Sequence, residues 1–233
     1  MTQTPRERAR AQTMQEIIRI GRGHLAVHGA AGLSLRAVAR DLGVVSSAVY
    51  RYVKNRDELL TLLVVDGYNA LGDAVDRAVE AVPVDDLPAQ FRALGRAVRT
   101  WALAEPARYG LLFGSPVPGY QAPAEQTTGP GTRMIGQLVG IFAAARKAGT
   151  LKEDGMGSVP AGSGLSADFE SIRNEMDLTL PDGVLARGVL VWAALFGAVN
   201  FEVFGQYGAS TFSDAGALFE VQLDVLAGVA GLA

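Results

Sequence analysis

The 233-residue sequence predicts an all-α fold, and two observations support this prediction. Apolar residues recur at spacings of three and four along most of the chain, which is the repeat of one helix face. Long alternating runs of Val, Ile and Thr between turn residues, which are typical of strands, are absent. Because 49% of the residues are apolar, a chain of this length can bury a core in one large or two small domains.

The first predicted helix begins at Pro5. Proline suits the first helical position because its missing N–H would have no partner there, and Thr4 precedes it. The apolar face of this helix comprises Met14, Ile17, Ile18, Gly21 and Leu25.

Residues 34–53, SLRAVARDLGVVSSAVYRYV, predict two short helices joined by a glycine turn. The first has one apolar face (Leu35, Val38, Ala39, Leu42), with Ser34 as its N-cap. Gly43 follows at a position where a left-handed turn suits glycine. Ser46 or Ser47 is expected to cap the second helix. Its inward residues are expected to be Val45, Val49, Tyr52 and Val53.

The outward residues near the start of the second helix are small, polar, tyrosyl or arginyl, as a helix that enters a DNA major groove requires. An ordinary helical hairpin whose serines serve only as caps is the alternative. We favour the helix-turn-helix because another capped helix follows at Asn55, with a glutamate three residues on.

The next helices follow the same apolar period. They are predicted over residues 56–82, 87–104, 106–113 and 132–148, with a Pro/Gly-rich surface loop over residues 114–131. Residues 149–181 are weakly specified. Within them, residues 155–166 are polar and small enough to be mobile, and 167–176 suit a short helix.

The last two helices are predicted over residues 182–206 and 213–232. The first carries two apolar stripes, so it must be buried on two sides. The second presents Leu218, Val221, Val225 and Leu226 on one side. Together they suit a symmetric four-helix dimer interface, with Phe201, Phe204, Gly188, Ala194, Gly197 and Ala198 allowing close approach. An internal hairpin in a monomer is the alternative.

Charge divides unevenly along the chain. Residues 1–60 hold ten Lys/Arg and five Asp/Glu, whereas the remaining 173 hold eleven and nineteen. A basic end that contacts phosphate and an acidic remainder that limits indiscriminate binding would explain this asymmetry. Chance clustering is the alternative.

Several chemistries find no support in the sequence. The chain has no cysteine, its N-terminus lacks an apolar signal region, and its most apolar stretch, residues 188–199, is too short to span a bilayer. His24 and His28 have metal-compatible spacing but no third ligand nearby. The glycine-rich segments lack a phosphate-loop lysine. We therefore expect a soluble, cytoplasmic, non-enzymatic protein with no catalytic residue, metal or cofactor.

The first 70 or so residues resemble the DNA-binding domain of the tetracycline-repressor (TetR) family of bacterial regulators. The match comprises residues 31–44, AGLSLRAVARDLGV, and 48–60, AVYRYVKNRDELL. Residues 101–113 and 192–205 also resemble one C-terminal subtype, in which a His-Gly pair follows a tryptophan by four residues. Here the pair is Phe196-Gly197, so no role for that imidazole carries over.

This resemblance implies a homodimer that reads a palindromic operator and a C-terminal domain that senses a ligand. We expect a DNA-binding domain at residues 1–57 and a sensing and dimerisation domain at 58–233. The predicted DNA-contacting residues are Ser34, Arg36, Ser46, Ser47, Ala48, Tyr50, Arg51, Tyr52, Lys54 and Arg56; Tyr52 is alternatively a core residue.

A second set of residues is predicted to line an effector site. Apart from Asn200, which would orient the ligand by a hydrogen bond, they are aromatic: Trp101, Tyr109, Phe113, Phe142, Trp192 and Phe196. Each aromatic is alternatively ordinary core, and Asn200 could instead bond to a backbone carbonyl. With no charge aimed inward, a neutral, mostly apolar effector is favoured. The rival functions are a helical small-molecule-binding or catalytic protein with an incidental helix-turn-helix, and an effector-independent DNA binder.

Overall fold

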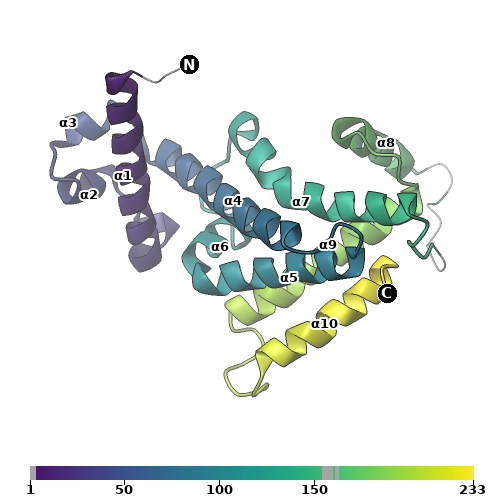
Figure 1. The fold of residues 1–233 in the computed structure, drawn as a ribbon. Coiled ribbons are helices and arrows are strands. Elements are labelled where there is room, and N and C mark those ends of the chain that lie inside the picture. Colours follow the sequence, from purple (N-terminus) through teal and green to yellow (C-terminus); the bar gives the residue numbers. More distant parts are fainter. Residues whose placement is uncertain (1–3, 154–159, 161–162) are drawn as a thin grey trace. The chain divides into compact units, whose positions relative to one another are not determined.

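The computed structural model describes residues 4–153, 160 and 163–233 (Figure 1). These residues form ten α-helices and one short 3-10 helix, and no strand occurs among them, which confirms the predicted all-α class. The chain folds into two compact units. Unit 1 comprises the residues up to 70 together with 104–131, and unit 2 comprises 71–103 together with 132–233.

Unit 1 is built on the N-terminal helices. A single cluster of apolar side chains fills its core, with Ile17, Val38, Val53 and Leu59 fully buried. The helices that contribute to the unit are α1 (Pro5–His28), η1 (Ala30–Gly32), α2 (Leu35–Asp41), α3 (Ser46–Val49), the first part of α4 (Arg56–Glu80), α6 (Pro106–Phe113) and the start of α7 (Ala124–Lys147).

The ends of α1 follow from its sequence. The Thr4 side chain accepts a hydrogen bond from the Glu7 backbone N–H, and the Glu7 carboxylate accepts one from the Thr4 N–H. This reciprocal capping satisfies two donors that have no partner within the helix, and Pro5 begins the helix as predicted. The helix ends at Gly29, which has a φ of 65°. Glycine suits that position because it has no Cβ to oppose the left-handed region.

Helix α4 contributes to the cores of both units. Leu59, Leu60 and Leu63 belong to the apolar cluster of unit 1, whereas Leu71 and Val75 are buried in unit 2. The compact units therefore do not divide at residues 57 and 58, where we placed the functional boundary, because the first two turns of α4 complete the core beneath the short helices.

Unit 2 is a bundle of longer helices. It contains the rest of α4 and of α7, together with α5 (Leu87–Ala104), α8 (Leu165–Met176), α9 (Asp182–Val203) and α10 (Ala215–Ala230). α9 and α10 lie side by side (Figure 1). Ion pairs fasten α5 to both of them: Arg99 to Glu202 at 2.6 Å, Arg96 to Glu220 at 2.6 Å and Arg92 to Asp224 at 2.8 Å.

The predicted loop over residues 114–131 is wrong in its second half. Helix α7 begins at Ala124 and includes Pro130. The Pro123 carbonyl accepts hydrogen bonds from the Gln126 and Thr127 N–H groups and from the Thr127 hydroxyl, which starts the helix before the breakers are reached. Pro130 then removes one backbone donor without ending the helix.

The segment between α7 and α9 is partly described. Helix α8 covers residues 165–176, close to the predicted 167–176. The prediction that residues 155–166 are mobile falls mainly on residues 154–159 and 161–162, which lie outside the described part of the chain.

Helix α10 turns only part of its predicted apolar side toward the core of unit 2. Its buried residues are Phe219, Leu223, Leu226, Ala227 and Ala230, whereas Val221 and Val225 are 62% and 61% exposed. The helix is apolar on both sides, so the period alone could not identify the side that faces its own unit. α9, with 22 residues, is long and apolar enough by composition to cross a membrane, so the expectation that its apolar stretch was too short is wrong. One such helix is weak evidence for a membrane span, because core helices of soluble proteins pass the same test.

Candidate DNA-binding surface and sensor cavity

Helices α2 and α3 form the predicted helix-turn-helix. The Ser34 hydroxyl accepts a bond from the Ala37 N–H at 3.5 Å, and Gly43 has a φ of 73° in the turn. Val38 and Ala39 of α2 and Val49 of α3 are buried in the core of unit 1. These contacts fix the angle between the helices and leave the opposite face of α3 outward.

The outward face carries most of the residues predicted to contact DNA. Arg36, Ser47, Tyr50, Arg51 and Lys54 are exposed. Ser34, Ser46 and Ala48 are half-buried. The exposed group comprises three cations, one hydroxyl and one phenol, which are donors suited to phosphate oxygens and base edges.

Two of the predicted contact residues are held by the protein itself. The Arg56 guanidinium donates to the Ala30 carbonyl oxygen at 2.9 Å and lies 3.7 Å from the Asp57 carboxylate. Tyr52 is half-buried against the core, and the Arg10 guanidinium lies 5.3 Å from its ring centroid. Arg10 is therefore a further cation beside this surface, which the sequence patterns did not single out.

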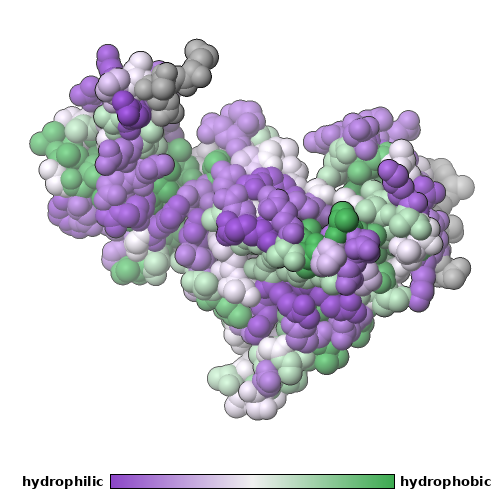
Figure 2. Space-filling view, in the orientation of Figure 1, coloured by the Kyte–Doolittle hydropathy of each residue, from purple (hydrophilic) through white to green (hydrophobic). Residues whose placement is uncertain are grey.

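The start of α3 differs from the sequence prediction. Val45, not a serine, occupies the N-cap position, and no side chain caps the helix. Val45 is 71% exposed rather than inward, and Val44 beside it is also exposed. The α3 helix ends at Val49, so Tyr50 and Arg51 lie in the turn that follows. Figure 2 shows hydrophobic surface where α2 and α3 meet.

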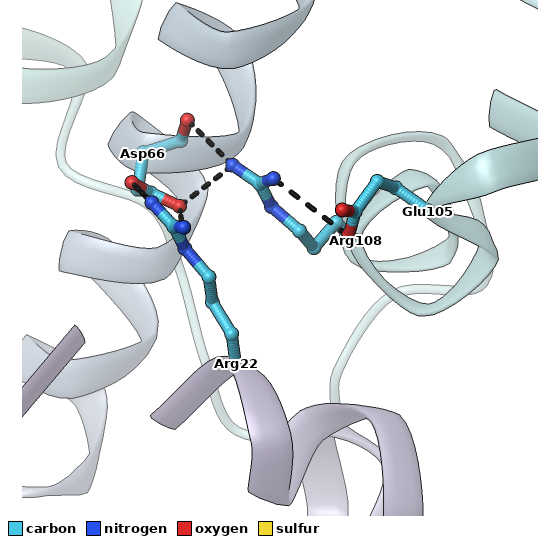
Figure 3. Close-up of polar contacts among 4 residues, drawn as sticks. All are labelled: Arg22, Asp66, Glu105 and Arg108. Atoms are coloured by element: carbon cyan, nitrogen blue, oxygen red, sulfur yellow. Dashed lines mark hydrogen bonds and ion pairs between the residues drawn. The ribbon is translucent and has the colours of Figure 1, made fainter. Parts of the chain in front are cut away.

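A cluster of four charged side chains joins α1, α4 and α6 within unit 1 (Figure 3). The Asp66 carboxylate accepts a bond from Arg22 Nε at 2.7 Å, and a second from Arg22 Nη2. Arg108 Nη2 donates to the same carboxylate at 2.7 Å and to the Asp66 backbone carbonyl at 3.1 Å. Glu105 lies 3.7 Å from Arg108 Nη1. The carboxylate of Asp66 raises the pKa of Arg22 further above its ordinary value, which keeps the charge fixed.

The two histidines have contacts of their own within unit 1. His24 Nε2 lies 2.7 Å from the Asp41 carboxylate, and the His24 and His28 rings meet edge to face at 6.0 Å. The hydrogen bond with His24, and then that with Arg40, lowers the pKa of Asp41. Among the described residues, no three His, Cys, Asp or Glu side chains gather as metal ligands would.

Unit 2 contains a cavity of about 350 Å³ between α7, α8 and α9. Of the residues predicted to bind an effector, Phe142 and Trp192 line it. Gly188 also lines it: a Cβ at that position would meet Phe142 at 3.1 Å. Gly188 was expected at the dimer interface, but its α-carbon faces this wall instead.

The other predicted ligand residues lie elsewhere. Trp101 and Phe196 are buried in unit 2 and do not line the cavity, although Phe196 packs edge to face on Trp192 with ring centroids 6.1 Å apart. Tyr109 and Phe113 belong to unit 1, where their rings lie 5.1 Å apart, and burial raises the pKa of Tyr109. Asn200 is half-buried and outside the cavity wall. Sequence reasoning missed the wall from α8, namely Phe169, Ile172 and Met176, because nothing in the sequence pairs that helix with α7.

Comparison with known proteins identifies the family. Residues 91–226 match the family model described as the tetracyclin repressor-like C-terminal domain. The chain is 48% identical over 225 residues to the HTH-type transcriptional regulators Rv1816 of Mycobacterium tuberculosis and Mb1846 of Mycobacterium bovis, which covers 96% of this chain and 94% of each relative. The chain belongs to the TetR family.

Solved structures agree with this assignment. The crystal structure of SCO4313 has a TM-score of 0.76 and 34% identity, and the match covers 97% of this chain and 100% of that one. A TetR-family protein from Rhodococcus RHA1, at 15% identity, shares the fold with a TM-score of 0.61 over 94% of this chain and 97% of its own. This TetR-family chain is thus a transcriptional regulator rather than an enzyme, and regulators of the family bind DNA and usually form dimers.

Proposed function

We propose that this TetR-family regulator is a cytoplasmic homodimeric repressor that binds a palindromic operator and leaves it when a small, mostly apolar effector enters the cavity of unit 2. The exposed face of α2 and α3 carries the DNA-binding part of the proposal. Arg36, Arg51 and Lys54 present cations around the short hydroxyl of Ser47 and the phenol of Tyr50. Cations that contact phosphate supply affinity, whereas side chains on base edges supply sequence preference.

Val45 adds an apolar element to this face. Because it is 71% exposed at the start of the recognition helix, its methyl groups are free to meet a thymine methyl. In the Val45→Ser variant we expect weaker binding to operators with thymine at the contacted position and little change elsewhere. Deoxyuridine lacks the thymine methyl group. Replacing each thymine of the operator in turn by deoxyuridine should therefore reproduce the loss of affinity in the wild-type protein at one position per half-site. If no uracil substitution matters, Val45 does not read the base.

The outer sides of α9 and α10 support the homodimer. Their exposed apolar residues include Leu190, Phe201, Val221, Val225 and Val229. A continuous apolar surface on two adjacent helices is costly in water and is relieved when a second copy presents the same surface. Sedimentation should give a dimer at micromolar concentration, and a two-fold dimer requires half-sites spaced by about one DNA turn or a multiple.

The cavity supports the effector. Its volume of about 350 Å³ is within the range of small-molecule sites, and its walls are mostly apolar. An effector can release DNA only if it binds the non-operator conformation more tightly, and a coupling of about 1–3 kcal/mol reduces operator affinity 5- to 150-fold. An effector-independent DNA binder remains the competing function.

One experiment tests the proposal as a whole. Purified protein selects its operator from a random DNA library, and fluorescence anisotropy then measures the affinity with and without each member of a small-molecule library. We expect a palindromic consensus and at least one apolar compound that weakens binding. A consensus without symmetry contradicts the dimeric repressor, and a cavity-binding compound without effect on DNA favours the effector-independent function.

A further inference from the structure

The cavity of unit 2 has one polar group that the protein leaves without a partner. Trp192 on α9 forms part of the wall. Its indole Nε1 is shielded from solvent and has no hydrogen-bond acceptor among the described residues. Buried tryptophan N–H groups usually find a partner, and an unpaired buried donor costs about 1–3 kcal/mol. An acceptor on a molecule bound in the cavity would satisfy this donor.

The surroundings of Trp192 limit where that acceptor comes from. Phe196 packs edge to face on the indole from one turn along the same helix, and a phenyl ring is a poor acceptor. Phe142 and Val189 line the same cavity and offer only hydrocarbon. The half-buried indole of Trp192 borders the cavity, and its N–H is shielded as the ring stands. A tilt of the ring would turn the N–H toward an acceptor on a molecule that fills the cavity.

Charge in the wall restricts the ligand further. Glu175, on the exposed side of α8, is the one ionisable residue among the described residues of the wall. Nearby Arg173 is engaged by the Asp182 carboxylate at 2.7 Å and by the Leu180 carbonyl at 3.3 Å. An anionic ligand would therefore lose hydration beside a carboxylate and gain no cation in return. A cationic ligand would find only the solvated Glu175, which is a weak partner.

We propose that the cavity binds a neutral, largely apolar molecule whose single hydrogen-bond acceptor, a carbonyl or ether oxygen, takes the indole N–H of Trp192. As the chemistry of an effector, this inference rests on the proposed function. As a statement about binding, it does not require that DNA be released.

Two probes of matched shape and one anionic probe test the ligand class. Hexanophenone carries a ketone oxygen, hexylbenzene has a methylene at the same place, and 4-hexylbenzoate carries a negative charge. Calorimetric titration measures the Kd of each probe for wild type, for Trp192→Phe, and for Trp101→Phe. The last variant is the matched control, because Trp101 is buried in the same unit but does not line the cavity.

The expected result is a difference between the probes. Trp192→Phe should weaken the binding of hexanophenone more than that of hexylbenzene, by a further factor of about 2 to 12. This factor corresponds to about 0.5–1.5 kcal/mol for one hydrogen bond, at 1.4 kcal/mol per tenfold change in Kd. Comparing the two probes removes the effect of the smaller ring on cavity shape. Trp101→Phe should not separate the two probes. In wild type, the benzoate should bind at least about tenfold more weakly than the ketone.

Nuclear magnetic resonance gives an independent readout. The chain has two tryptophans, so its ¹H–¹⁵N spectrum contains two indole signals, which the Trp101→Phe variant assigns. We expect the Trp192 signal to move downfield with hexanophenone and not with hexylbenzene.

The outcomes separate the ligand class from the regulatory proposal. The inference would be overturned if Trp192→Phe weakened the binding of hexylbenzene and hexanophenone equally, if the Trp192 indole signal did not move, or if the benzoate bound tightly. Failure of all three probes to bind wild type would overturn it and also remove the cavity as the effector site, while leaving DNA binding untouched. Ketone binding that depends on Trp192 but leaves operator affinity unchanged would support the inference and contradict release by that ligand.

Discussion

Replacing Asp66 in the charged cluster of unit 1 should lower the stability of the protein, and the contacts of the cluster set the size of the loss. Asp66→Asn removes one negative charge from between two arginines while keeping nearly the same side-chain volume. Arg108 is 8% exposed, Asp66 is 17% exposed and Arg22 is 42% exposed. The change therefore leaves the Arg108 guanidinium almost fully buried without the Asp66 carboxylate, whereas the Arg22 guanidinium can regain water.

The expected loss in the free energy of unfolding is about 3 kcal/mol. Removing one partner of a buried ion pair costs about 3–5 kcal/mol because the other charge stays uncompensated. The lower end applies here, since Arg108 keeps its bond to the Asp66 backbone carbonyl and its contact with Glu105. The pair with Arg22 adds little, because a half-exposed pair contributes only up to about 1 kcal/mol.

Differential scanning calorimetry measures the effect. For a chain of about this size, 3 kcal/mol corresponds to a fall in Tm of about 6–12 °C. The matched control is Arg22→Gln, which removes the exposed partner and should lower Tm by no more than about 4 °C. A Tm for Asp66→Asn within 2 °C of wild type, or a larger loss for Arg22→Gln than for Asp66→Asn, would refute the view that burial of Arg108 sets the cost.

Three further predictions concern DNA, the dimer and pH. Arg51→Ala should cost about 1–3 kcal/mol of operator affinity if the guanidinium contacts a base, whereas Lys54→Ala should weaken binding to all DNA sequences alike and reduce the salt slope by about one. Anisotropy titrations at several salt concentrations measure both effects, and unchanged affinity in both variants would contradict the assigned face. Val225→Asp should convert the dimer to a monomer in sedimentation because it places a charge on the exposed apolar side of α10, and a persistent dimer would locate the interface elsewhere. The hydrogen bonds from Arg173, and then from Ser166, lower the pKa of Asp182 below its ordinary value of 3.8. The stability that Asp182 contributes is therefore present above pH 3.8 and is lost as the pH falls through the lowered pKa. A carbon NMR titration of Arg173→Gln should show the pKa of Asp182 returning toward 3.8, and an unchanged pKa would contradict this cause.

Local patterns in the sequence predicted much of unit 1. Ser34, Gly43 and Asn55 each act through a backbone group or turn within a few residues, so their caps and turn could be identified without knowledge of the rest of the chain. The bounds of α5 and α6 were predicted correctly for the same reason, since prolines and periodic apolar residues mark them. The exposed positions of Arg51 and Lys54 follow once the apolar face of the short helices is known.

The chain by itself therefore determined the helical class, the helix-turn-helix and the resemblance to the TetR family, because helical period, capping and turn chemistry are encoded within a few neighbouring residues. Tertiary structure decided the rest. α10 has two apolar sides, and only packing within unit 2 showed that Val221 and Val225 face outward. Pro130 is a breaker in sequence, but α7 begins at Ala124, where the Pro123 carbonyl accepts bonds from its first turn, and continues through Pro130. The cavity depends on α7, α8 and α9 meeting across long sequence separations, and the partners of a buried charge or indole are set by such meetings, which no local pattern records.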